Sequence, residues 1–411
     1  MKAGDVMQYS SRTTSVTSMK SQTVKIDQLL IVMLVIYNTF TKLQVFNSLR
    51  INVVVWVLYF ILTCKHLFHS NRLLLIGILC AACMGGIMFL RGHAENITSG
   101  VGSFMHMVFW TYVFSQRTAN SGKKHYDKRL LYTILLILMI SDCMALNLLY
   151  QYPLASRAVA GYESETLISY YLKIGVADFG YVYGSVFIEY LILNLIKNEK
   201  QKFTQLLLLT GWIIKALFII KASYMMAVFA LIVLTIYHLI LYRNTINRKI
   251  FLVLICVAGI ILFIPILQIL QTIFSSVGLV EMANHVGNLV TSITDRSISN
   301  QSRSFMWQRS INGFIANPIF GCGASGGHSF VLDTLSYYGI IGLPFILYRI
   351  NVFKSWRGKI KGGDIVVIAL VYMTIQLFNA YSSYNTMPML MFIVPWGLAC
   401  CYQENRGNVN A

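Results

Sequence analysis

The hydrophobic positions of this chain come in continuous runs that are separated by short polar segments. The runs are about 16 to 26 residues long, and an α-helix needs about 20 apolar residues to cross a bilayer. We therefore predict an all-α, polytopic membrane helix bundle with about twelve transmembrane helices. The predicted spans are 26–42, 51–66, 73–90, 99–115, 130–149, 171–196, 204–220, 222–242, 250–274, 330–348, 364–381 and 387–402.

The charged residues are few and unevenly distributed. The chain is 56% hydrophobic and 12% charged, with a net charge of +18. If the N-terminus is cytoplasmic, 23 of the 33 Lys and Arg residues fall in cytoplasmic segments, among them Arg349 just after the tenth span, and 8 fall in outside loops. This asymmetry follows the positive-inside rule, so it predicts two cytoplasmic termini and explains the basic charge without a nucleic-acid partner.

The spans divide the chain into a cytoplasmic polar tail (1–25), an integral membrane domain (26–402) and a second cytoplasmic tail (403–411). Residues 275–329 form a large extracytoplasmic loop before the tenth span. Apolar residues recur every three to four positions from Leu279 to Ile293, which predicts an amphipathic helix. A second helix is expected to begin near Arg303 and to end before Asn317-Pro318, because proline disfavours the helical conformation of the preceding residue.

The ionisable residues inside predicted spans include Asp142, Lys173, Asp178, Glu189 and Lys215. A charge in hydrocarbon is costly, so these side chains are expected to face the bundle interior or water. Asp142, Lys173 and Asp178 lie toward the outside ends of their spans, which predicts a polar outer half of the bundle.

The second loop helix carries a candidate anion ligand. At about 100° per residue, Arg303 shares one face with Trp307 and Ser310, whereas Arg309 points away. A guanidinium binds phosphate through two parallel hydrogen bonds and stays charged, so Arg303 suits an anionic ligand. A surface arginine that only extends toward water is the better interpretation of Arg309.

A glycine-rich segment follows this helix and includes Gly321 and Gly323. Glycines let a backbone approach a ligand closely, although alone they also fit a flexible loop. His328 comes next, and Asp333 and Tyr337 are one helical turn apart, so a polar face is expected to descend from His328 into the tenth span.

These residues form a recognisable pattern. The Arg-x-x-x-Trp helix, the Asn-Pro-x-x-Gly-x-Gly turn and the Gly-His-Ser before an apolar helix with Gly-Ile-Ile-Gly resemble the C-terminal signature of the O-antigen polymerase and O-antigen ligase superfamily. The resemblance implies a glycosyltransferase without metal or cofactor at the outer face of the bacterial cytoplasmic (inner) membrane. Its partners would be polyprenyl-diphosphate-linked glycan donor and acceptor and membrane lipid, with a flippase and a chain-length regulator as further candidates.

The resemblance also implies roles for residues. His328 would orient or deprotonate the acceptor hydroxyl, Arg303 would bind the leaving diphosphate, and Asp333 would support His328. The family often has an arginine where this chain has Lys221, which lacks the bidentate fork; Lys215 and Arg157 are further candidate cations. The expected substrate-binding residues are Lys221, Arg157, Tyr224, Trp307, Tyr337, Gly321, Gly323 and Asp178.

Three functions are compatible with this pattern. The first is a polymerase of lipid-linked repeat units for O-antigen, capsule or exopolysaccharide. The second is a ligase that transfers the glycan to a lipid or protein acceptor, since acceptor choice depends on loop shape. A polysaccharide flippase or transporter belongs to another class, and it is disfavoured because the chain has no evident internal repeat.

Overall fold

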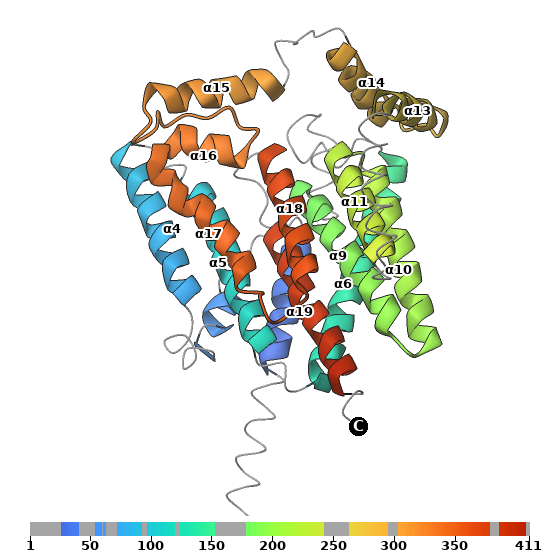
Figure 1. Ribbon diagram of the computed structural model, residues 1–411. Helices are drawn as coiled ribbons and strands as arrows, with labels where there is room; N and C mark the ends of the chain where they lie inside the picture. The colour runs from blue at the N-terminus through green and yellow to red at the C-terminus, as the bar shows by residue number, and fades with distance from the viewer. Residues whose placement is uncertain are drawn as a thin grey trace, which may run out of the picture.

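The computed structural model describes residues 26–40, 54–59, 61–62, 72–92, 97–119, 124–152, 178–241, 263–294, 303–378 and 386–407. All regular elements in these ranges are helices, as predicted (Figure 1). They include a helix at Ile26–Thr39, α4 (Arg72–Leu90), α5 (Ile97–Ala119), α6 (Lys124–Gln151), α9 (Phe179–Asn198), α10 (Lys202–Lys221), α11 (Met225–Leu241), α13 (Phe263–Ser276), α14 (Val280–Thr294), α15 (Arg303–Ala316), α16 (Phe330–Tyr338), the 3-10 turn η2 (Gly339–Gly342), α17 (Leu343–Lys354), α18 (Gly362–Phe378) and α19 (Thr386–Gly407), and residues 54–59 and 61–62 are also helical.

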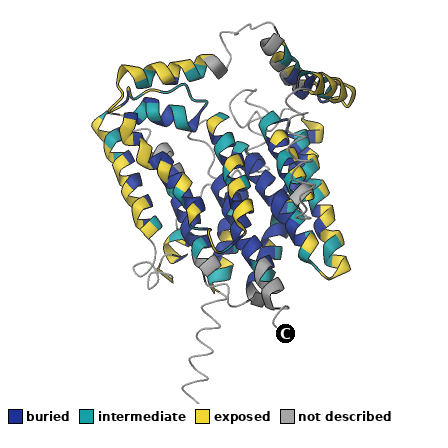
Figure 2. Ribbon diagram, in the orientation of Figure 1, coloured by how far each residue is buried: buried dark blue, intermediate teal, exposed yellow. Residues whose placement is uncertain are grey.

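The core of the bundle is built around α9, which packs against α19, α10 and α11. Figure 2 shows α9 and α19 buried in the centre and exposed residues along the outer faces of α4 and α10. The exposed residues are apolar, for example Leu75 and Leu206 at 61% and 62% exposure. A helical bundle that is apolar both inside and outside is typical of a protein surrounded by lipid.

The predicted spans agree with the described helices in position. Five helices are long and apolar enough to cross a membrane: Arg72–Leu90, Asp127–Gln151, Phe179–Asn198, Lys202–Lys221 and Phe330–Lys354. Shorter apolar helices coincide with several of the other predicted spans. The polytopic helical fold is therefore confirmed, while the number of twelve spans and the domain boundaries remain predictions.

The tenth span differs from the prediction in its shape and its end. Gly339 has a φ of 66° and ends α16, so the run from Phe330 to Lys354 is divided by η2. Figure 1 shows α16 lying beneath α15 across one end of the bundle, which we call the α15 end, with α17 running down from it. The predicted boundary at residue 348 is also too early, because α17 continues to Lys354 and Arg349 is buried within it.

The amphipathic loop helix is present as α14. Met282 and Val286 are buried while Val280 is exposed, as the three-to-four spacing predicts. α14 packs against α13, and the turn between them includes Gly278 with a φ of 77°.

Three of the ionisable residues, Lys215, Asp142 and Asp178, have specific partners. Lys215 of α10 is 1% exposed and forms an ion pair of 2.7 Å with Asp142 of α6. Asp178 precedes α9 instead of lying inside a span, and its carboxylate accepts a hydrogen bond from the Tyr181 N–H as the N-cap. Glu189 is buried in α9, whereas Lys173 lies outside the described residues.

Candidate functional site

The candidate site lies on α15, α16 and the segment that joins them. α15 ends at Ala316, directly before Asn317-Pro318, as the sequence predicts. The Asn317 carbonyl accepts a hydrogen bond of 2.7 Å from the Gly321 N–H, and the Asn317 side chain accepts one of 3.3 Å from the Phe320 N–H. The chain therefore reverses in a short hydrogen-bonded turn below α15.

Gly321 and Gly339 bring two backbone segments into direct contact. Both have a positive φ, and a Cβ at Gly321 would lie 2.5 Å from the Gly339 nitrogen. Hydrogen bonds of 2.8 Å from the Cys322 N–H to the Ser336 carbonyl and from the Ile340 N–H to the Pro318 carbonyl hold the two segments together. Gly321 therefore packs on the end of α16, and its part in substrate binding stays a prediction.

Asp333 of α16 holds the segment that precedes α16. Its side chain is buried and accepts hydrogen bonds from the Ser310 hydroxyl at 2.7 Å, the Gly327 N–H at 3.1 Å and the Ser329 N–H at 3.0 Å. The Ser310 hydroxyl in turn accepts one from the Gly326 N–H at 2.8 Å. Asp333 thus joins α15, α16 and the backbone on both sides of His328.

The face of α15 that was predicted to pack inward does so. Ser310 is buried and Trp307 is half-buried, while Arg309 is exposed. The Trp307 indole N–H donates to the His328 carbonyl at 3.3 Å, and its ring lies 5.2 Å from the ring of Phe378 in α18. Arg303 is the first residue of α15, and its side chain is outside the described part of the structure.

His328 is half-buried and lies between two fixed backbone groups. Gly327 before it and Ser329 after it donate to Asp333, and Ser329 is also the N-cap of α16 through a bond of 3.3 Å from the Leu332 N–H. The sequence suggested Asp333 as a supporting partner of His328. The described hydrogen bonds join Asp333 to the backbone on both sides of His328, and its role in catalysis stays a prediction.

Arg91 is a site residue that the sequence did not reveal. It follows α4, and its guanidinium donates to the carbonyls of Tyr337 and Phe320 and, at 3.5 Å, to that of Gly321. Its Cζ also lies 5.8 Å from the centre of the Tyr337 ring. A cation at the C-terminus of a helix is favourable, but nothing in the sequence pairs Arg91 with residues more than 200 positions away.

A second group of predicted residues lies where α9, α10 and α11 meet. Lys221 ends α10, with its Nζ 4.8 Å from the centre of the Tyr150 ring. Ser223 has a φ of 59° and donates to the Lys221 carbonyl at 3.2 Å. Tyr224 is buried, and its ring lies 4.5 Å from that of Phe179, the residue after Asp178. Lys221, Tyr224 and Asp178 therefore belong to this second group, whereas Gly323, Trp307 and Tyr337 belong to the α15–α16 site.

The remaining candidate cations have different outcomes. Lys215 is neutralised by Asp142 and donates to the Ser185 hydroxyl at 3.4 Å, so it serves the interior of the bundle. Arg157 lies outside the described residues. Within the described ranges, no three His, Cys, Asp or Glu side chains gather in a way that could hold a metal ion.

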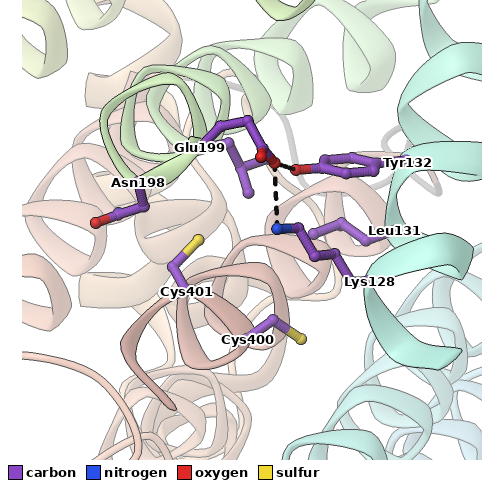
Figure 3. A pocket seen from close by; sticks show the side chains of 8 residues that line it. Lys128, Leu131, Tyr132, Asn198, Glu199, Cys400 and Cys401 are labelled. Carbon is purple, nitrogen blue, oxygen red and sulfur yellow. Dashed lines mark hydrogen bonds and ion pairs between the residues drawn. The ribbon is translucent and has the colours of Figure 1, made fainter. Parts of the chain in front are cut away.

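Figure 3 shows a small pocket away from this site, between α6, α9 and α19. Lys128 pairs with Glu199 at 3.1 Å, and the Tyr132 hydroxyl donates to the same carboxylate. Burial raises the pKa of Glu199, but the hydrogen bonds from Tyr132, the Gln201 N–H and Lys128 outweigh it, so the pKa is lower than usual. This carboxylate therefore stays ionised and ties α6 to the end of α9.

A comparison with protein families matches residues 209–348 to the family described as O-antigen ligase. The matched region begins in α10, contains Lys221 and the whole α15–α16 site, and ends in α17. No curated protein and no solved structure matched the chain.

Proposed function

We propose that this chain, which matches the O-antigen ligase family over residues 209–348, belongs to the O-antigen ligase and polymerase superfamily and polymerises polyprenyl-diphosphate-linked oligosaccharide repeat units. The reaction would take place at the outer face of the cytoplasmic membrane without a metal ion. Its product would be an O-antigen, capsule or exopolysaccharide chain. The observation that carries this proposal is the fixed position of His328 at the α15 end of the bundle.

The reaction needs one proton acceptor and cations. A hydroxyl oxygen of the acceptor glycan attacks C1 of the donor sugar, and the bond between C1 and the diphosphate oxygen breaks with its electron pair going to the diphosphate. The hydroxyl proton passes to the imidazole of His328, which accepts protons near neutral pH. The imidazolium then returns the proton to water or to the departing diphosphate, so the enzyme is unchanged.

His328 suits the role of base because its backbone is held on both sides. Asp333 binds the N–H groups of Gly327 and Ser329, and Trp307 binds the carbonyl of His328 itself. A catalytic group works best when the surrounding residues hold it within a fraction of an ångström of its working position. In this proposal, Asp333 is the positioning residue of the site.

The diphosphate would be bound by Arg303, whose guanidinium can stabilise negative charge as it develops on the leaving group. Lys221 is the second proposed cation, since Lys215 is already paired with Asp142. Arg157 keeps its proposed role in this set. Tyr224, Asp178, Tyr337, Gly323 and Trp307 would line the path of the glycans.

Reconstitution tests the proposal. The purified full-length chain in proteoliposomes should lengthen lipid-linked repeat units. His328→Ala should reduce the rate at least about 100-fold, since general acid–base catalysis contributes about 10²–10⁴-fold. Arg303→Ala should also reduce it at least about 100-fold, since loss of one group that stabilises developing charge costs about 10²–10³-fold. Arg309→Ala is the matched control, because Arg309 is exposed on the same helix. Full activity of His328→Ala would refute the proposal. Transfer to a second lipid or protein acceptor without chain lengthening would identify a ligase instead, and flux of lipid-linked glycan without transfer would identify a transporter.

A further inference from the structure

Arg349 is a buried cation with neutral partners. It lies in α17 and is 6% exposed. Its Nη1 donates to the Tyr372 hydroxyl at 3.0 Å and to the Gln376 side-chain oxygen at 2.7 Å, both on α18. Its Nε is buried without a hydrogen-bond partner. The guanidinium therefore has donors left over after its contacts with α18.

Other interior cations of the bundle, unlike Arg349, are paired with carboxylates. Arg117 pairs with Asp27 and Asp127, and Lys215 pairs with Asp142. Within the described residues, by contrast, no carboxylate lies within ion-pair distance of Arg349. An arginine keeps its charge in proteins, and a charge inside a membrane bundle without a counter-ion costs several kcal/mol. Such a residue is expected to have an anionic partner, which the described residues do not supply.

The position of Arg349 indicates which anion would bind to it. Its Cζ lies 3.8 Å from the centre of the ring of Phe330, the first residue of α16 and two positions after His328. On α18, Gln376 lies two positions before Phe378, whose ring contacts Trp307. Both contacts involve residues that lie close to His328, so the guanidinium lies beneath the start of α16.

The surroundings of Arg349 hold its side chain in place. The Tyr372 hydroxyl also lies 3.8 Å from the sulfur of Met107, and the Gln376 amide nitrogen lies 3.6 Å from the sulfur of Met387. Thioethers are weak acceptors that cannot neutralise a charge. The two neutral partners therefore orient the guanidinium and leave its charge uncompensated.

We propose that Arg349 binds the phosphate oxygens of a lipid-linked diphosphate from inside the bundle, beneath His328. This inference rests on the proposed function, and it adds a cation from α17 to the proposed cations Arg303 and Lys221. Nη1 would stay bound to α18, and Nε, which is buried without a hydrogen-bond partner, would donate to an anionic oxygen. The charge of Arg349 would hold the diphosphate end of the donor so that its C1 remains near the imidazole.

The test measures diphosphate binding by the full-length chain in nanodiscs. Undecaprenyl diphosphate should bind at least about tenfold more weakly to Arg349→Gln, a loss of about 1.4 kcal/mol. Arg349→Lys should bind undecaprenyl diphosphate more weakly than the wild type and more tightly than Arg349→Gln, because lysine keeps a point charge but lacks the planar fork of arginine. Arg357→Gln, which removes the same charge from an exposed position, is the matched control and should bind as the wild type does.

Several outcomes would overturn the inference. One is a folded Arg349→Gln variant that binds undecaprenyl diphosphate as tightly as Arg357→Gln does. Another is loss of phosphatidylglycerol binding alone, which would assign Arg349 to a phospholipid headgroup. If Arg349→Gln does not fold, unchanged binding by Arg349→Lys would overturn it. Normal polymerisation by Arg349→Gln with an inactive His328→Ala would refute this inference alone, whereas an active His328→Ala would refute the proposed function.

Discussion

Replacing Asp333 with alanine should loosen the backbone on both sides of His328. The carboxylate is 2% exposed and accepts from the N–H groups of Gly327 and Ser329 as well as from the Ser310 hydroxyl. The hydroxyl can rotate toward another acceptor, but the two N–H groups would remain unsatisfied. Each buried unsatisfied donor costs about 1–3 kcal/mol, so the turn should lose about 2–6 kcal/mol of local stability.

Hydrogen exchange measured by mass spectrometry can detect this loss. Exchange in a turn reports its local opening, and each 1.4 kcal/mol corresponds to about a tenfold change. Peptides that cover residues 321–329 of Asp333→Ala should therefore exchange at least about tenfold faster than in the wild type. Polymerisation should fall at the same time. The exchange rate of Asp333→Asn should lie between those of the wild type and Asp333→Ala, because the asparagine amide keeps one acceptor oxygen.

Asp364 provides the matched control for this experiment. It is a buried carboxylate at the start of α18, away from the α15 end, and it accepts from the Tyr190 hydroxyl at 2.6 Å. Asp364→Asn should leave exchange in residues 321–329 unchanged. If Asp333→Ala exchanges within about twofold of this control, its carboxylate does not hold the turn and the positioning role is wrong.

Three further predictions concern the supports of the site and of the bundle. Arg91→Ala removes the guanidinium from three carbonyls, so polymerisation should fall and the turn should become more sensitive to proteolysis; unchanged cleavage would contradict this. Gly321→Ala should lower thermal stability more than Gly358→Ala, because both glycines have a positive φ but only the first Cβ would meet backbone atoms; equal losses would refute the packing argument. Lys215→Met should destabilise the protein by about 3–5 kcal/mol in thermal unfolding, and adding Asp142→Asn should recover part of that loss; additive losses would show that the pair is not coupled.

Much of the fold was predictable because it depends on local pattern. Apolar runs of membrane length position the helices, since the bilayer imposes the same length on each. The buried face of α15 was equally predictable, because burial of Ser310 and exposure of Arg309 follow from 3.6 residues per turn. The end of α15 before Asn317-Pro318 follows from the conformational preference of the residue before proline.

The partners of the charged residues were not predictable. Lys215 looked like a candidate for the site, and the structure pairs it with Asp142; Arg349 was counted as cytoplasmic, and the structure buries it in α17. Arg91 counted only toward the charge asymmetry, yet it binds two carbonyls of the turn and the carbonyl of Tyr337 in α16. The sequence spacing of these pairs carries no signal, because the contacts join different helices.

By itself, the sequence determined the helical membrane class, the approximate place of each helix and the segment from Arg303 to Gly342 as the centre of interest. These properties depend on hydrophobicity, helical period and turn chemistry, which act over a few residues. Only the tertiary structure decided that Asp333 holds the backbone around His328, that Gly321 packs on Gly339, and that the charge of Arg349 lies beneath α16 without a carboxylate partner in the described residues. Those relations depend on how helices distant in sequence pack, and packing is a property of the whole bundle.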